Sequence, residues 1–168
     1  MPQGETARTR IANWLSALMT IPGLSGFEGP VRRKLAAELT ALNIAHRTDR
    51  LGNLIATLQG AEGVPSVMLI AHMDQLGLIV RKVEGNGLLR VERVGGVPER
   101  ALLAQAVTLS VGGGKTVSGV IASKSHHATA PDEKYKVLPY QDLYIDCGFA
   151  SAAEALAAGV NVGTPAVY

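Results

Sequence analysis

SVMLIAHMDQLGLIV, residues 66–80, joins two apolar runs through the triplet His72-Met73-Asp74. The first run has the length and composition of a buried strand, and the second begins another strand. Functional side chains gather at the tips of buried strands in α/β sheets. The stretch therefore predicts an α/β fold in which residues 69–72 form a buried strand that ends at a candidate metal ligand.

Upstream of this stretch the sequence predicts two helices and a hairpin. Apolar residues at helical spacing indicate a first helix over residues 7–20. Ser25 and Glu28 have the spacing of a capping box, with Ser25 as the cap of a second helix that ends near residue 42. Two short strands around a glycine turn are expected next, over 44–48 and 53–58.

After Asp74 the sequence changes to short β-prone segments separated by glycine-containing turns. Four of them follow at close spacing, over 76–83, 87–94, 105–111 and 116–122. Asn86-Gly87 is a strong hairpin signal. This pattern predicts a small β-barrel or sandwich inserted into the α/β domain. Further on, we expect a polar loop over 123–137, a strand over 143–147, a short helix over 151–158 capped by Ser151, and a last extended segment.

Composition narrows the class of protein. The net charge of the 168 residues is +2 and no segment concentrates basic and aromatic residues, so we expect no nucleic-acid partner. No apolar run is long enough to span a membrane, so we expect no membrane partner. Cys147 is the one cysteine, which excludes an intrachain disulfide and fits a reducing, cytoplasmic location. Its position after an apolar strand favours a buried, inert thiol.

His72 and Asp74 have the spacing of a metal ligand and its orienting carboxylate. Residues two apart in a strand face the same side, with Cα atoms about 6.5–7 Å apart. Asp74 could then accept a hydrogen bond from the ring nitrogen of His72 that does not hold the metal, which fixes the tautomer. The dyad alone is equally compatible with a structural histidine.

Three further motifs have features of functional sites. GGGKT, residues 112–116, lacks the first glycine of a phosphate-binding loop because Leu109 stands there, so a hairpin turn is expected. Adjacent His126 and His127 rarely ligate one metal, and a loop that contacts substrate or a neighbouring subunit, or a solvated loop, is expected instead. Ser25 and Ser66 lack a nucleophile context, which leaves a serine hydrolase unsupported.

Six segments occur in an order that resembles one family, the deblocking or glutamyl aminopeptidases that assemble into tetrahedral particles. They are GLSGFEGPVR (23–32), DRLGNLIA (49–56), LIAHMDQLGLIV (69–80), RVGGV (93–97), GVIASKSHH (119–127) and LYIDCG (143–148). Some relatives of these TET aminopeptidases have been labelled endoglucanases. The resemblance covers nearly the whole chain from about Ile11.

The resemblance implies the start of a zinc-peptidase-like α/β/α sandwich with an inserted β-barrel. It assigns residues 1–74 to the catalytic α/β domain, 75–164 to the β-rich dimerisation domain and 165–168 to the return to the catalytic domain. His72 would be a ligand and Asp74 its orienting catalytic carboxylate in a two-metal site holding zinc or cobalt. Peptides would be the substrates, and the β domain would form dimers that build a twelve-subunit particle.

In that family the bridging Asp, the catalytic Glu and the other ligands follow the β domain, where this sequence stops. We therefore expect an N-terminal portion of a two-metal aminopeptidase that is inactive alone. The alternative is a non-enzymatic oligomerisation or binding module with a relic metal site. A glycoside hydrolase is a third hypothesis, for which the sequence offers no identifiable carboxylate pair.

Overall fold

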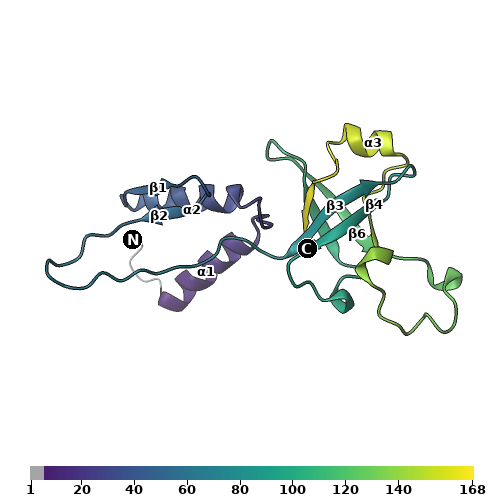
Figure 1. The fold of residues 1–168 in the computed structure, drawn as a ribbon, viewed down its shortest axis with the longest axis horizontal. Helices are drawn as coiled ribbons and strands as arrows, with labels where there is room; N and C mark the ends of the chain where they lie inside the picture. The colour runs from purple at the N-terminus through teal and green to yellow at the C-terminus, as the bar shows by residue number, and fades with distance from the viewer. Residues whose placement is uncertain (1–5) are drawn as a thin grey trace. The chain divides into compact units, whose positions relative to one another are not determined.

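The computed structural model describes residues 6–168, and contacts divide the chain into two compact units, Met1–Asp74 and Gln75–Tyr168. The first unit holds two helices and a hairpin, and the second a closed six-stranded β-barrel (Figure 1). The predicted α/β class with a small β-barrel is confirmed. Within residues 6–168, no helix is both long and apolar enough to cross a bilayer.

The first unit begins with α1 (Ala7–Met19), which Thr6 caps by accepting a hydrogen bond from the Thr9 amide at 3.2 Å. The second helix is α2 (Gly29–Ala41). An antiparallel hairpin of β1 (His46–Thr48) and β2 (Leu54–Ala56) follows. The carboxylate of Asp49 closes its turn by accepting hydrogen bonds from two backbone amides, those of Leu51 and Asn53 at 2.9 Å.

The predicted buried strand over 69–72 is wrong. Residues 65–74 have no strand assignment and run as an open ribbon (Figure 1). Leu69 is 92% exposed and Ile70 82% exposed. The prediction rested on hydrophobic burial, but a strand also needs a neighbour to pair its backbone groups. None of the strands within residues 6–168 pairs with this segment.

The predicted capping box at Ser25 is also wrong. Glu28 occupies the N-cap position of α2, without a side-chain cap. The Glu28 carboxylate instead accepts the amide of Gly26 at 2.7 Å, and the Ser25 hydroxyl donates to Asp74. A contact 49 residues away in sequence thus replaces the local cap that the spacing suggested.

All six barrel strands are antiparallel to their neighbours and close in the order β3-β4-β7-β6-β5-β8. Their bounds are Gly77–Val83 for β3, Leu89–Val94 for β4, Ala106–Ser110 for β5, Thr116–Ala122 for β6, Tyr144–Asp146 for β7 and Pro165–Val167 for β8. Closure leaves no free sheet edge. Residues 165–168, expected to begin the return to the catalytic domain, include β8, which joins β3 to β5.

The barrel interior is aliphatic and follows the alternation of the strands. Ile145 of β7 lies opposite Leu89 of β4 on one side and Ile121 of β6 on the other. Ala166 of β8 lies in the same way between Leu78 and Leu109. All six side chains are at most 1% exposed. Every member of the buried core cluster falls within the second unit.

The last helix, α3 (Ala152–Ala157), packs on the barrel through Ala155, which is fully buried. Ser151 caps it as predicted, accepting the Glu154 amide at 3.3 Å. On another part of the barrel, β6 passes close to β7 at Gly119. A Cβ at Gly119 would lie 2.7 Å from both Cys147 Sγ and Ile145 Cγ2.

Candidate functional site

His72 and Asp74 contact each other through their side chains, at the end of the unpaired segment over residues 65–74. Nδ1 of His72 lies 2.9 Å from Oδ1 of Asp74 and 3.0 Å from the Asp74 carbonyl oxygen. A ring N–H at Nδ1 that donates to these acceptors leaves a lone pair at Nε2. The His72 side chain is 86% exposed, so Nε2 is open to a ligand.

Asp74 is held by a second donor that the sequence did not reveal. The Ser25 hydroxyl donates to the other carboxylate oxygen, Oδ2. This hydrogen bond, and after it the one from His72, keep the pKa of the Asp74 carboxyl below its usual range. Asp74 is therefore a carboxylate acceptor for the His72 ring at neutral pH, with an orientation fixed from two sides.

Gly23 lies between α2 and the backbone that precedes Asp74. A Cβ at Gly23 would lie 2.7 Å from a methyl group of Val31 and 3.5 Å from the carbonyl oxygen of Met73. Only a residue without a side chain fits there without displacing its neighbours. Gly23 thus allows the segment before α2 to lie close to Val31 of that helix.

The dyad provides one metal ligand with its orienting carboxylate. A neutral imidazole nitrogen suits zinc and related divalent metals. A structural or catalytic zinc site needs at least three protein ligands. Within the described residues, no group of three or more His, Cys, Asp or Glu side chains is placed to hold a metal ion. His72 therefore fits a metal as one member of a larger ligand set.

His126 and His127 lie in the second unit, on the short 3-10 turn His126–Ala128. Their rings pack edge to face with centroids 5.9 Å apart. Lys134 donates through Nζ to Nε2 of His126 at 3.3 Å. The two rings are nearly perpendicular, with an interplanar angle of 81°.

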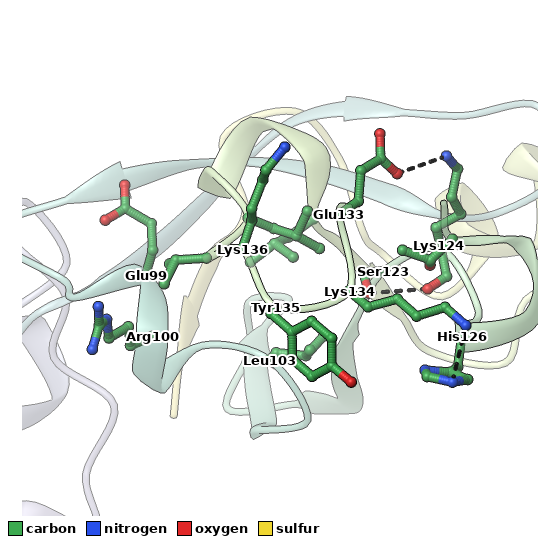
Figure 2. Close-up of a pocket in the computed structure, with 14 residues that line it drawn as sticks. Glu99, Arg100, Leu103, Ser123, Lys124, His126, Glu133, Lys134, Tyr135 and Lys136 are labelled. Carbon is green, nitrogen blue, oxygen red and sulfur yellow. Dashed lines mark hydrogen bonds and ion pairs between the residues drawn. The ribbon is translucent and has the colours of Figure 1, made fainter. Parts of the chain in front are cut away.

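His126 lines a cavity of about 720 Å³ that residues of the second unit form. Two segments surround it: the 3-10 turn Glu99–Ala101 with Leu103, and the loop over residues 123–138 (Figure 2). This cavity was not predictable from the sequence, because no single motif encodes it. Its one sequence signal is the density of lysines in the loop.

GGGKT forms the turn between β5 and β6, as predicted. The Val111 amide donates to the Lys115 carbonyl at 3.1 Å, and all three glycines have positive φ. A side chain at these positions would be strained because the left-handed region disfavours a Cβ. The turn leads into a strand, which excludes the strand–loop–helix arrangement of a phosphate-binding loop.

Comparison with known proteins agrees with this architecture. The M42 glutamyl aminopeptidase model matches residues 52–168, and the chain belongs to this family. Glutamyl aminopeptidase from Lactococcus lactis is 32% identical over 151 residues, which are 89% of this chain and 42% of the relative. The chain spans about two fifths of the length of the curated relatives it matches.

Solved structures of the family share the fold. Aminopeptidase APDkam598 from Desulfurococcus kamchatkensis matches with a TM-score of 0.87 and 35% identity, over 97% of this chain and 44% of that one. The Pyrococcus horikoshii TET1 peptidase can assemble into a tetrahedron or a large octahedral shell. It matches with a TM-score of 0.82 and 32% identity, over 94% of this chain and 46% of that one. The family resemblance stated above is thereby confirmed.

Proposed function

We propose that this chain supplies one part of a metal-dependent aminopeptidase that removes N-terminal residues from peptides. Membership of the M42 family supports this, as do relatives named glutamyl and lysyl aminopeptidase. The observation in the chain itself that carries the proposal is the His72–Asp74 pair, with Nδ1 of the ring held at 2.9 Å and Nε2 exposed.

In this proposal His72 is a metal ligand through Nε2, and Asp74 is its orienting carboxylate. Asp74 accepts the Nδ1 proton, which fixes the tautomer and makes Nε2 more basic. Ser25 keeps the carboxylate in place through its other oxygen. Two divalent ions, zinc or cobalt, would when bound polarise the scissile carbonyl and lower the pKa of a water molecule.

The chain of 168 residues would not catalyse the reaction alone. Residues 6–168 hold one candidate ligand of the set, and no group of three. The further ligands and a general base would come from the part of the polypeptide that the longer relatives have. We place the complete protein in the cytoplasm, which fits a chain with a single cysteine.

The barrel is proposed as the self-association domain, forming dimers that can build a dodecamer. A solved relative is a TET1 dodecamer, with 35% identity and a TM-score of 0.78 over 92% of this chain. The barrel carries its own core, so it can present a stable surface. Sedimentation of this chain should give a dimer or larger species, and a monomer at every concentration would contradict the assignment.

The decisive test replaces His72 in the complete polypeptide. His72→Ala should lower both metal content and peptide cleavage, because a ligand is removed. Asp74→Asn should weaken metal affinity roughly 10- to 100-fold, as is typical when an outer carboxylate is lost. Metal content is measured by elemental analysis and cleavage with aminoacyl anilides.

His46→Ala is the matched control, because this histidine lies on β1 and contacts the Ile44 carbonyl through Nδ1. It should leave metal content and cleavage near the wild-type level. Full metal content in His72→Ala would contradict the ligand assignment. Loss of cleavage with full metal content would show that His72 acts in some other way.

A further inference from the structure

We propose that the cavity of the barrel unit binds an acidic peptide, with Arg100 and the Lys134–His126 pair each taking one carboxylate. The cavity, about 720 Å³, has the size typical of small-ligand sites. The excess of positive charge is a property of the cavity itself. The choice of a peptide as the source of the carboxylates rests on the proposed function.

The cavity has more cationic than acidic side chains. Four cations line it, Arg100, Lys124, Lys134 and Lys136, against two carboxylates, Glu99 and Glu133. Concave sites lined by one sign of charge raise the local concentration of the opposite charge. The excess of positive charge therefore favours an anionic ligand.

Both lining carboxylates already have cationic partners. Glu99 accepts from Arg93 at 3.0 Å, and Glu133 pairs with Lys124 at 3.5 Å. Lys136 pairs at 3.1 Å with Asp132, which does not itself line the cavity. Two cations of the lining thus remain available: within the described part of the chain, neither Arg100 nor Lys134 contacts a carboxylate.

These two cations lie toward opposite sides of the cavity in Figure 2. Arg100 lies at one side, and the Lys134 ammonium contacts His126 at the other. The ring of Tyr135 and the side chain of Leu103 lie between them in this view. Tyr135 is 96% exposed and Leu103 50% exposed, so an apolar surface is open between the two positive ends.

A short acidic peptide has the matching chemistry. Its side-chain carboxylate and its C-terminal carboxylate are two anions separated by a backbone and an apolar side chain. Arg100 presents a planar fork that suits a carboxylate, whereas Lys134 is a point charge. The apolar side chain would cover Tyr135 and Leu103, which an inorganic anion could not do.

The probe is the tripeptide Glu-Leu-Ala with a free C-terminus, titrated into the 168-residue chain. Binding is followed by calorimetry and by amide chemical shifts at low salt, where exposed charges are screened least. The neutral isostere Gln-Leu-Ala-amide and inorganic phosphate are titrated in parallel. The neutral peptide should bind roughly tenfold more weakly or worse, since it loses two charge-assisted contacts. Phosphate should compete only weakly.

Arg100→Gln and Lys134→Gln should each raise the Kd for Glu-Leu-Ala roughly three- to tenfold, the range for partly exposed charge pairs. Lys115→Gln is the matched control, because it removes the same charge from the β5–β6 turn, away from the lining. It should stay within about twofold of wild type. The amide spectra also report whether each variant is folded.

Equal Kd values for the acidic and neutral peptides, or unchanged Kd values in both variants, would overturn the proposal. So would the absence of peptide binding up to millimolar concentration. Phosphate binding as tightly as the peptide would identify a simple anion site and reject the peptide. Binding is measured without turnover, so the two proposals are tested separately. Absence of peptide binding would not contradict the aminopeptidase proposal, and an inactive complete protein would not contradict peptide binding in the cavity.

Discussion

Cys147 follows β7 and packs, half-buried, against the barrel core. Burial raises the pKa of the thiol to about 11, and the negative charge of Asp146 adds to the effect. The thiolate is the reactive form of cysteine. With this pKa, roughly one thiol in a thousand is ionised at pH 8. Burial is therefore the physical reason for the low reactivity that the sequence predicts for this thiol.

Alkylation of the folded chain by iodoacetamide should therefore be slow at pH 8 and rise about tenfold per pH unit up to pH 10. In urea the pKa returns to about 8.5, so the rate at pH 8 should be roughly a hundredfold higher. The stability of the chain depends on pH for the same reason. The thiol ionises at lower pH in the unfolded chain than in the folded chain, so the free energy of unfolding falls as pH rises from about 8.5 towards 11. Cys147→Ser gives the background rate. A rate already at its plateau near pH 9 in the folded chain would contradict this prediction.

The dyad shows how far single-residue predictions from sequence extend. The spacing of His72 and Asp74 predicted the contact between their side chains, and this contact forms although residues 65–74 are not in a strand. Ser25 could not be predicted as the second donor, because it lies 49 residues earlier. The position of Ser25 before a helix favoured a role as the N-cap, but its hydroxyl donates to Asp74 instead.

The pairing of β6 with β7 depends on the absence of a side chain at Gly119. A Cβ there would meet Cys147 and Ile145 at 2.7 Å and the Asp146 carbonyl oxygen at 3.1 Å. All three lie on or next to β7, so the clash would push the two strands apart. Real side chains do not approach this closely without displacement of the neighbours.

Gly119→Ala should lower the free energy of unfolding by about 1–3 kcal/mol, the usual cost of overpacking. Urea unfolding followed by circular dichroism measures it. Gly96→Ala is the control, because nothing lies within 4 Å of its Cβ and its φ is not positive. It should change stability by less than about 0.5 kcal/mol. Equal stability of the two variants would mean that β6 and β7 do not approach as closely as described.

Helices and hairpins were largely predictable, because their signals lie within a few residues. The barrel strands alternate apolar and polar side chains, and glycine turns separate them, so their bounds came out within a few residues. The strand over 69–72 failed because an apolar run predicts burial only when other elements cover it. Its side chains remain exposed in the described structure.

The two units differ in how much core they contain. The second unit holds all of the clustered core, from Leu78 to Ala166. In the first unit the buried apolar side chains are those of Leu24 and Val31 among the residues described. Because burial of apolar surface is the dominant favourable contribution to folding, the stability of the chain should reside in the barrel.

Residues 75–168 expressed alone should fold and unfold cooperatively, with the β signature in circular dichroism. Residues 1–74 alone should exchange their amide hydrogens rapidly, because few apolar contacts oppose opening. Hydrogen exchange of the intact chain should show the same contrast. Slow exchange throughout the first unit, or a barrel that fails to fold alone, would contradict this division of stability.

The cavity between the Glu99–Ala101 turn and the loop over 123–138 could not be predicted from the sequence. Its lining comes from segments that are far apart in the sequence and have no regular spacing. Charge pairing decides which of its lysines is available, and that depends on contacts that only the folded chain defines. The basic loop was visible in the sequence, whereas the site was not.

The place of β8 has a consequence for the order in which the barrel can be made. β3 is the first barrel strand that a ribosome releases, yet one of its edges pairs with β8, the last. Until Val167 has emerged, the nascent barrel is an open sheet whose outer strands have unpaired backbone groups, a form prone to association with other chains. Non-local pairing of this kind is also slow. Closure must therefore wait for synthesis of the entire unit, and nascent chains stalled before β8 are the ones that most need chaperone protection.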